Sequence, residues 1–428
     1  MGLHMNRRQF LRFLASLSAT TAAAMLSDPL RPRLAFAQSA SGKTLVVIFQ
    51  RGGNDGLNTV VPFGDPDYYA LRGAIAVPPP NASDPTAALA LNGFGAPSNF
   101  FSLHPALAPF LPLWNTGMLA VLPAAHYPDA SQSHFDGQEN IESGASSATV
   151  DGWLNRHLVT LPRPAALRAA GFGDQLPHAL RGPLVVSAFN DLASFTTGLP
   201  PNDDAALLAD LDRVYSQSPD SARAYRALIV EHGRAVLNDL AVLSAIDPAS
   251  YVPANGAVYP GTTYGSQLRQ VAQLIKADLG LEVAALSIDG WDTHANQGGG
   301  EAAGQQARLL QTFAAGIAAL VTDLGAARMR DVVILSMTEF GRTAAVNDSL
   351  GTDHGHAAAW FVAGGSVRGG VYGVWPGLSA QNLERGRYLD HSIDFRDVLG
   401  DIVTRHLGNS NLAIVLPGHS YQPVGVMA

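Results

Sequence analysis

The sequence predicts an α/β protein with a mostly parallel central sheet, helices on both faces and a helical insertion. Three observations predict this class. Short apolar runs rich in β-branched residues recur along the chain, as in strands that are buried on both faces. A long segment with apolar residues every three or four positions joins two of these runs, which indicates an amphipathic crossover helix. The 43 glycines and 27 prolines indicate many loops between the elements.

The elements can be placed in chain order. Runs typical of strands lie at residues 44–49, 118–122, 184–187, 283–288, 332–337 and 360–363. A helix opened by proline is expected at 103–114. The helix expected at 305–324 links the strands on either side of it, which predicts a right-handed βαβ crossover. A closing helix at 394–407 ends at Gly408.

Residues 203–247 differ from the rest of the chain. Helical spacing follows capping acids or serine, and few strand signals interrupt it. We therefore expect residues 38–428 to form one α/β domain with a helical insertion at about 200–250. The 428 residues are 47% apolar and 14% charged, which is sufficient for one large core with such an insertion.

Charge and cysteine content exclude some classes of function. The net charge of −8 argues against a nucleic-acid-binding surface, which is basic. There is no cysteine, so the fold has no disulfides and any metal site must use nitrogen and oxygen ligands.

The first 37 residues have the pattern of a twin-arginine export signal. Arg7 and Arg8 precede an Ala- and Ser-rich apolar stretch, and Ala37 ends a small-residue cleavage motif, so the mature chain would begin at Gln38. We therefore expect a periplasmic or secreted protein. A basic amphipathic N-terminus is the alternative. No later segment sustains 18 apolar residues, so no membrane span is expected in the mature form.

Carboxylates and imidazoles gather at strand ends. Asp292 and His294 follow the run at 283–288, and residues two apart in extended backbone point the same way, so both can bind one ion. His354 and His356 repeat this spacing before the last run. A capping Asp with a surface His is the alternative for the first pair, and either later His could instead hydrogen-bond a ligand carboxylate.

Three further groups follow other strands. Glu339 and Arg342 follow the run at 332–337; a guanidinium there can clamp an anionic oxygen or form a salt bridge with a nearby acid. Asp55 lies in the glycine-rich turn after the first strand, where Asn-Asp-Gly also occurs for conformational reasons.

Two serines follow the run at 118–122, at the expected start of a helix. Ser133 and Ser131 are candidate nucleophiles because free N–H groups at a helix start favour negative charge. Helix capping is the alternative for both. The adjacent His134 is a candidate ligand or proton carrier.

These groups, in this order, resemble the alkaline phosphatase superfamily. In that fold a metal-binding Asp follows the first strand, as Asp55 does, and a nucleophile stands at a later helix start, as Ser133 or Ser131 does. An Asp-and-His metal motif after a strand is similar to Asp292-Thr-His294. The resemblance implies an alkaline-phosphatase-like fold and hydrolysis of phosphate or sulfate esters.

Within that superfamily the chain is similar to DUF1501, a family of exported bacterial proteins known only as a domain of unknown function. The similar pieces span nearly the whole mature chain: Gly53-Asn-Asp-Gly-Leu-Asn58, Leu103-His-Pro-Ala-Leu107, Ser133-His-Phe135, Gly290-Trp-Asp-Thr-His294, Thr338-Glu-Phe-Gly-Arg342 and Asp353-His-Gly-His356. The family's reaction is not established, so this resemblance implies a fold more than a substrate.

One departure from the superfamily pattern affects the metal content. The usual Asp-His pair becomes Glu339-Phe340, and phenylalanine cannot bind metal. We expect one or two divalent ions, either Zn²⁺ or a harder ion such as Mn²⁺, Mg²⁺ or Ca²⁺. The expected ligands of the first ion are Asp292, His294 and His354, with His356 nearby. Asp55 and Glu339 would hold the second.

The resulting hypothesis is an exported metal-dependent hydrolase of phosphate or sulfate esters. Ser133 or a metal-activated water would attack, and Arg342 would orient an anionic small-molecule or glycan substrate. The alternative is a non-catalytic, metal-containing protein that binds an anionic surface ligand.

Overall fold

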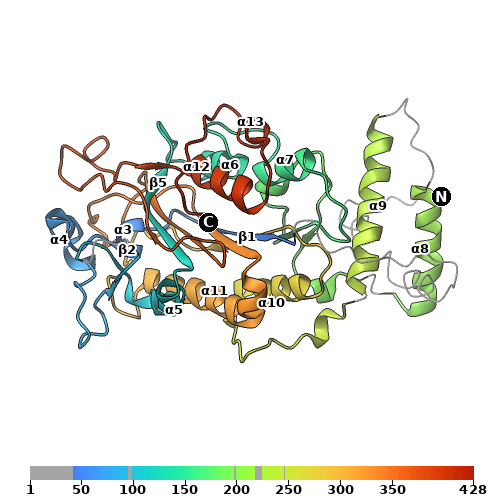
Figure 1. Cartoon of the computed structure of the whole chain (residues 1–428), viewed down its shortest axis with the longest axis horizontal. Coiled ribbons are helices and arrows are strands. Elements are labelled where there is room, and N and C mark those ends of the chain that lie inside the picture. The colour runs from blue at the N-terminus through green and yellow to red at the C-terminus, as the bar shows by residue number, and fades with distance from the viewer. Residues whose placement is uncertain (1–41, 95–98, 197–198, 217–223, 245) are drawn as a thin grey trace.

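The chain folds around one large sheet with helices on both faces (Figure 1). The structure is a computed structural model, and it describes residues 42–94, 99–196, 199–216, 224–244 and 246–428. The expected export signal at residues 1–37 lies outside the described residues.

The large sheet has nine strands within the described residues. They are β1 (Thr44–Arg51), β5 (Leu119–His126), β6 (Ala169–Phe172), β7 (Ala188–Phe189), β8 (Val283–Asp289), β9 (Val332–Met337), β10 (Ala358–Gly364), β11 (Gly370–Val371) and β12 (Ile393–Asp394). Their order is β11-β5-β10-β9-β1-β8-β6-β7, and β12 pairs with β5. Among these strands, β10 alone runs antiparallel to its neighbours β5 and β9. The predicted mixed α/β fold with a mostly parallel sheet is therefore confirmed.

The central strand β1 shows why the sheet is buried on both faces. Val46 and Ile48 belong to one apolar core, and Leu45, Val47 and Phe49 belong to another on the opposite face. This alternation follows from the two-residue period of a strand. Each such side chain contributes roughly 1.5–3 kcal/mol on burial.

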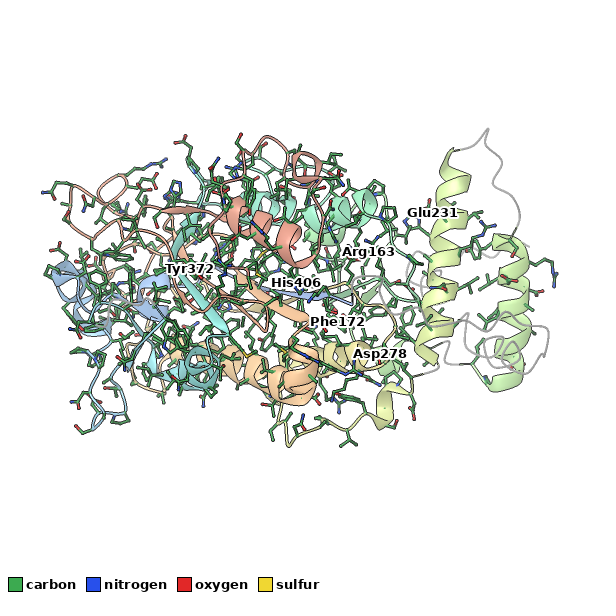
Figure 2. The ribbon with its side chains drawn as sticks, viewed as in Figure 1. Arg163, Phe172, Glu231, Asp278, Tyr372 and His406 are labelled. Carbon is green, nitrogen blue, oxygen red and sulfur yellow. The ribbon has the colours of Figure 1, made fainter. Side chains whose placement is uncertain are left out.

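Helices cover both cores. On the Val46 side lie α5 (Leu111–Asn115), α10 (Thr263–Lys276) and α11 (Gln305–Met329), and on the Leu45 side lie α6 (His134–Ser143), α7 (Trp153–Thr160), α12 (Phe395–Asp401) and α13 (Leu412–Val415) (Figure 1). Side chains fill the space between the sheet and both helical layers (Figure 2). A separate three-stranded sheet forms from β2 (Val60–Val61), β3 (Leu89–Ala90) and β4 (Ser102–Leu103).

Short helices occupy the connections. They are α3 (Gly56–Thr59), α4 (Pro66–Arg72), η1 (Gly73–Ile75), η2 (Pro105–Phe110), η3 (His178–Leu180), η4 (Leu192–Ser194), η5 (Pro248–Ser250) and the π-helical η6 (Ile402–His406). The helix expected at 103–114 is the pair η2 and α5, because Pro109 and Pro112 interrupt regular α-helical bonding. The closing helix is α12 followed by η6.

The expected crossover helix is α11, which joins β8 to β9 across the central strand β1. The helix is regular up to Leu324, and Gly325 then adopts non-helical angles (φ 68°). By length and composition α11 could cross a membrane, but half of its most apolar window is buried within the protein, as in a core helix. Phe313 and Ile317 are among its residues in the core.

The prediction of a strand at 184–187 was wrong by a few residues. The strand that forms is β7, which pairs with β6 through only two residues. Leu184 instead donates its backbone N–H to Asn155 Oδ1 at 3.1 Å. The side-chain oxygen of Asn155 therefore accepts the backbone N–H of Leu184, which a longer strand would have used for pairing.

Helices α8 (Pro201–Tyr215) and α9 (Ala224–Ser244) lie side by side at one end of the long axis (Figure 1). They occupy the segment for which an insertion was expected. Asn238 Nδ2 of α9 donates to the carbonyl of Ala166 at 3.0 Å, and the Ser187 hydroxyl donates to the buried Asp239 carboxylate. Burial raises the pKa of Asp239 to about 6.

Asp239→Asn should stabilise the protein in a pH-dependent way. Because the folded-state pKa of Asp239 lies above its unfolded value, the neutral form suits the fold, and stability is lost as the pH rises through about 6. Asparagine stays neutral. We expect a gain of about 1–3 kcal/mol in unfolding free energy at pH 8 that vanishes near pH 4, measured by urea denaturation. The exposed Glu231→Gln on the same helix (Figure 2) is the control and should change stability by less than about 0.5 kcal/mol.

Candidate metal centre

The sheet topology brings the segments that carry Asp292, Glu339 and His354 to one edge. Strands β1, β8 and β9 are parallel, so the residues that follow them meet at the carboxyl edge. Strand β10 is antiparallel to β9, so its amino end lies at that same edge and delivers His354 there. Strand β5 runs the same way as β9 and leads into α6, which begins at His134.

Three imidazoles converge on the carboxylate of Asp292. From Asp292 Oδ1 the distances are 2.9 Å to His294 Nε2, 3.3 Å to His354 Nε2 and 3.5 Å to His134 Nε2. The Nε2 atoms of His294 and His354 are 3.2 Å apart. The four side chains are 25–45% exposed, so an ion can reach them from solvent.

The opposite nitrogen of each imidazole is held by an acceptor. His134 Nδ1 lies 2.7 Å from Glu339 Oε1, His294 Nδ1 lies 2.9 Å from Asp353 Oδ1, and His354 Nδ1 lies 2.8 Å from the carbonyl of Gln132. Carboxylates and carbonyls accept protons, so each Nδ1 donates and each neutral ring turns its Nε2 lone pair into the cluster.

Most of this donor set has the spacing of ligands on one ion. Ligand atoms about 2.1 Å from a tetrahedral ion lie about 3.4 Å from one another, and four of the separations in the set range from 2.9 to 3.5 Å. The ligand atoms of His134, Asp292 and His354 all lie within 4.8 Å of one another, and His294 stands outside that group while contacting Asp292 and His354. In addition, the buried Nε2 of His134 has no hydrogen-bond partner. Three nitrogens and one oxygen therefore form a candidate metal centre at the carboxyl edge.

Arg342 holds Asp292 in place. Its Nη1 donates to Asp292 Oδ1 at 2.7 Å and to the carbonyl of Gly52 at 3.3 Å, and its Nη2 donates to the carbonyl of Thr352. Burial favours the neutral carboxyl, but the hydrogen bond and charge of Arg342 outweigh it and lower the pKa of Asp292. Of the two roles expected for Arg342, the salt bridge with a nearby acid is therefore the one that forms. Its buried guanidinium supports Asp292, a candidate ligand.

Glu339 is a buried anchor for the cluster. Its carboxylate accepts hydrogen bonds from His134, from Gln138 Nε2 at 3.0 Å, from the backbone N–H of Gly52 at 2.8 Å and from the Thr338 hydroxyl at 3.0 Å. Burial favours the neutral acid, but these bonds hold the pKa of Glu339 below its usual value. In return, the bond to Glu339 raises the pKa of His134.

Gly52 is required at the turn after β1. Its φ of 121° is favourable only for glycine, and a Cβ there would lie 2.5 Å from the backbone nitrogen of Asp292. The close approach lets one residue bond both Glu339 and Arg342.

Asp55, a predicted metal ligand, lies in a different interaction. Its carboxylate forms a two-point ion pair with the buried Arg72, accepts from Gln297 Nε2 and caps α3 through the N–H of Leu57. Both oxygens are therefore engaged by protein donors. Together with the saturated carboxylate of Glu339, this leaves the expected second pair of ligands without a free oxygen facing the cluster.

The two candidate serines differ in their hydrogen bonds. Ser131 Oγ donates to Asp136 Oδ2 at 3.0 Å and accepts from the N–H of Ser133 at 3.1 Å, which closes a local turn before α6. Ser133 is the residue before α6, and its hydroxyl has no hydrogen-bond partner among the described residues. Ser133 therefore occupies the capping position without making a capping hydrogen bond, and the Ser131 hydroxyl is used in the turn before the helix.

The structure separates His356 from His354, although the spacing predicted one side for both. The chain bends at His356, which breaks the alternation of a strand. Its Nε2 lies 2.9 Å from the carbonyl of Tyr127, and its ring packs 4.6 Å from that of the buried His126. Burial lowers the pKa of His126 to about 3, so that ring is neutral.

Several side chains of the cluster have a larger role than the sequence indicated. His134 was a candidate ligand or proton carrier and stands inside the cluster; its position at a helix start after a strand was the available signal. Asp353 orients His294, and the bond from His294 lowers the pKa of Asp353. No sequence pattern pointed to the carbonyl of Gln132 or to Arg72.

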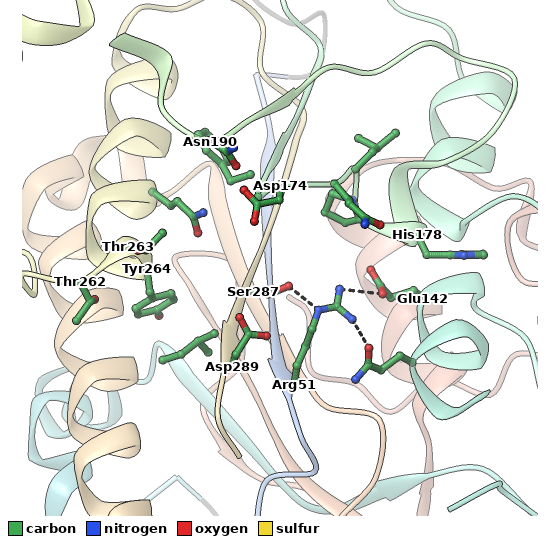
Figure 3. Close-up of a pocket in the computed structure, with 18 of the residues that line it drawn as sticks. Arg51, Glu142, Asp174, His178, Asn190, Thr262, Thr263, Tyr264, Ser287 and Asp289 are labelled. Atoms are coloured by element: carbon green, nitrogen blue, oxygen red, sulfur yellow. Dashed lines mark hydrogen bonds and ion pairs between the residues drawn. The ribbon is translucent and has the colours of Figure 1, made fainter. Parts of the chain in front are cut away.

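An open cavity of about 840 Å³ lies at the ends of β1, β6 and β8 (Figure 3), and its lining includes Phe135 and Gln138 of α6 but none of the four cluster residues. Arg51 donates to Ser287 Oγ, Gln138 Oε1 and Glu142 Oε2, each at 2.9 Å. Gln138 also bonds Glu339, so it connects the cavity to the residue that anchors His134. The wall of the cavity includes Phe172, Asp174, Asn190, Tyr264 and Asp289.

Fold and site together define a mixed α/β protein with a His₃Asp cluster at the carboxyl edge of its sheet. The chain belongs to the family described as "Protein of unknown function (DUF1501)", whose sequence profile matches residues 122–406. A comparison with curated proteins finds no match.

Asp55→Asn tests whether Asp55 is structural. Removing the carboxylate leaves the buried guanidinium of Arg72 without its anion, so the unfolding free energy should fall by about 3–5 kcal/mol. Urea denaturation measures this loss, and the Zn²⁺ stoichiometry of the folded variant should equal that of the wild type. The exposed Asp348→Asn is the control. A stable variant that lost one equivalent of metal would return Asp55 to the role of ligand.

Proposed function

We propose that this chain is an exported, metal-dependent hydrolase of phosphate or sulfate esters. The observation that carries the proposal is the convergence of three imidazole Nε2 atoms and Asp292 at a solvent-accessible edge. Each ring is held by an acceptor on Nδ1 and directs its Nε2 toward the same carboxylate, which is the arrangement of metal-ligating histidines and their supporting partners.

We also propose that the fold is alkaline-phosphatase-like. Support comes from the mostly parallel sheet and from the order in which its strand ends supply Asp55, Ser133, Asp292 and Glu339. The departure noted from the sequence, Phe340 in place of a ligand, agrees with the saturated carboxylates of Asp55 and Glu339. A single-ion centre is therefore the form we propose.

The donor set favours a borderline ion. Imidazole nitrogens suit Zn²⁺ and related transition ions, whereas Mg²⁺ and Ca²⁺ prefer oxygen ligands throughout. His134, His294, His354 and Asp292 would hold the ion. Bound there, a divalent ion supplies a Lewis acid and lowers the pKa of a nearby hydroxyl or water.

The chain's own residues have separate tasks. Glu339, Asp353 and the carbonyl of Gln132 fix the ring orientations, and Arg342 fixes Asp292. The N–H groups of the first turn of α6 favour negative charge beside Ser133.

The proposed reaction has two steps. The oxygen of Ser133 forms a bond to phosphorus or sulfur, the ester oxygen leaves as an alcohol with the serine proton, and water then releases the inorganic acid and restores the serine. Direct attack by water, with release of the same products, is the alternative route.

The cavity at the ends of β1, β6 and β8 is a candidate site for the rest of the substrate. Figure 3 shows Asp174, Asn190 and Asp289 on its wall, beside the aromatic ring of Tyr264, while Arg51 is engaged by Glu142. Carboxylates, amides and aromatic rings bind hydroxyl groups and sugar faces. The lining therefore favours an ester of a polyhydroxylated compound such as a glycan.

One observation favours the second candidate, a non-catalytic binding protein. Arg342 is fully buried and occupied by Asp292, so it does not face an incoming anion. An anionic ligand would then be held by the ion and by helix N–H groups. Turnover by metal-loaded protein separates the two candidates.

Glu339→Gln should weaken metal binding by about 10–100-fold, because His134 loses the charged acceptor that orients it and makes it basic. Titration calorimetry with Zn²⁺ after removal of bound metals measures the affinity. Glu139→Gln, an exposed change on the same helix α6, should leave it unaltered. Equal affinities in wild type and Glu339→Gln would remove His134 from the proposed ligand set.

Ser133→Ala should lower kcat/KM for an aryl phosphate, phosphodiester or sulfate by at least about 10³-fold with the metal retained. Ser131→Ala, whose serine only caps the loop, should lose less than about 10-fold. Chelation should abolish activity, and Zn²⁺ should restore it. A rate unchanged in Ser133→Ala selects direct attack by water, and no turnover by metal-loaded protein selects the binding protein.

Mass spectrometry of protein from the cell envelope checks export, since the mature chain should begin at Gln38.

A further inference from the structure

The cavity at the ends of β1, β6 and β8 contains polar side chains that the fold leaves without partners. Gln267 of α10 is only 5% exposed and lines the cavity, yet its amide has no hydrogen-bond partner among the described residues. A buried amide without a partner is costly unless water or a ligand satisfies it. The exposed side chains of Asp174, Asn190 and Asp289 line the same cavity, and within the described part of the chain they too form no hydrogen bond or ion pair.

The cavity also carries an excess of negative charge. Figure 3 shows Arg51 joined to Glu142, whereas Asp174 and Asp289 have no basic partner. With histidine counted as neutral, four carboxylates face two guanidiniums along the whole lining, and these are Glu139, Glu142, Asp174 and Asp289 against Arg51 and Arg181. Such a cavity attracts cationic groups and repels anions.

An exposed aromatic ring lines the cavity one residue from the cluster. Phe135 is 84% exposed and directly follows His134 at the start of α6. An accessible aromatic ring offers an apolar face to the C–H groups of a sugar and a favourable position to a cation. A ligand that occupies the cavity can therefore extend along α6 toward the cluster.

A second hollow, of about 500 Å³, adjoins the cavity. The two share Asn190, Thr262 and Thr263 in their walls. The charged residues of the second hollow, Asp191 and Arg269, balance each other, so the excess of negative charge is confined to the first. Two adjoining hollows suit a ligand that is longer than one sugar ring.

The partners that the cavity requires narrow the class of ligand. A protonated polyamine could pair with Asp174 and Asp289, but it offers no acceptor to the NH₂ groups of Gln267 and Asn190. A neutral sugar could bond the amides, because a hydroxyl both donates and accepts, but it would leave the negative charge uncompensated. An amino sugar supplies hydroxyls and an ammonium group together.

We propose that this cavity binds a short chain of amino sugars, with ammonium groups at Asp174 and Asp289 and hydroxyls at Gln267 and Asn190. The inference rests on the proposed function in one respect, which is that this chain is the part of the ester substrate that does not react. The anionic ester would lie at the cluster and the cationic sugars in the cavity. Groups of opposite charge on one substrate would thus go to separate sites.

Two matched oligosaccharides test the proposal by titration calorimetry on the full chain. Tetramers of glucosamine and of N-acetylglucosamine share a backbone, but only the first carries ammonium groups at about pH 5.5, where aspartates are ionised. We expect the glucosamine tetramer to bind at least about 10-fold more tightly, because charge-assisted hydrogen bonds to Asp174 and Asp289 hold it. Raising NaCl to about 0.5 M should remove most of this preference.

Variants locate the binding. Asp174→Asn/Asp289→Asn should bind the glucosamine tetramer about 10–100-fold more weakly and the N-acetylated tetramer within about 3-fold of the wild type. Both positions are exposed, so the variant should fold. Gln267→Leu, which removes the amide at similar volume, should weaken both ligands. The control Glu231→Gln/Asp348→Asn removes two exposed carboxylates outside the cavity and should match the wild type.

Several results would overturn the proposal. They are equal affinities of the wild type for the two tetramers, no binding of the glucosamine tetramer, or a preference that Asp174→Asn/Asp289→Asn retains. Tighter binding of spermine than of the glucosamine tetramer would overturn it in favour of a polyamine. The comparisons of ligands need only the wild type, so they stand even where a variant does not fold.

The two tetramers contain no ester, so this test is separate from the test of hydrolysis. Preferential binding of the glucosamine tetramer without turnover of any phosphate or sulfate ester would refute the proposed activity and leave the amino-sugar site. Conversely, turnover of esters by a protein that does not bind the glucosamine tetramer would leave the activity and refute the site.

Discussion

The buried carboxylate of Glu339 is the interaction on which the candidate metal centre depends. It joins the turn after β1, the end of β9 and the first turns of α6 through Gly52, Thr338, His134 and Gln138. An ionised carboxylate is costly to bury unless its oxygens are satisfied, and here four donors satisfy them. The same bonds connect α6 to the sheet. Without Glu339, His134 would lose the acceptor that orients its ring.

The antiparallel direction of β10 is the second constraint. In a wholly parallel sheet, residues that precede a strand lie at the amino edge, away from those that follow its neighbours. Because β10 is reversed, His354 is placed beside Asp292 and His294, which follow β8. Arg342 holds the loop that carries His354. The backbones of Arg342 and His354 form an antiparallel β-bridge, and the Arg342 guanidinium forms an ion pair with Asp292. One reversed strand thus allows ligands from both directions of the chain to meet.

Much of this arrangement could be predicted from residue types, because strand runs and the chemistry of the residues that end them are local signals. The runs at 44–49, 283–288 and 332–337 correspond to β1, β8 and β9 within three residues. Asp292, His294 and His354 do meet. What the sequence did not reveal depends on partners distant in the chain. Arg72 forms an ion pair with Asp55, and Arg342 forms an ion pair with Asp292. The side-by-side placement of His354 and His356 failed because alternation holds only in extended backbone, and the chain bends there.

The His₃Asp cluster is not self-stabilising. Two imidazole nitrogens 3.2 Å apart, both with lone pairs directed inward, repel each other, and Asp292 adds negative charge beside them. The fold nevertheless holds every ring through an acceptor on its far nitrogen, and it holds the carboxylate through a buried guanidinium. Hydrogen bonds that maintain an unfavourable arrangement are characteristic of functional sites, where the unfavourable groups are completed by a ligand. A positive charge at the centre would turn each of these repulsions into an attraction, and three nitrogens with one oxygen define the kind of ion that can supply it.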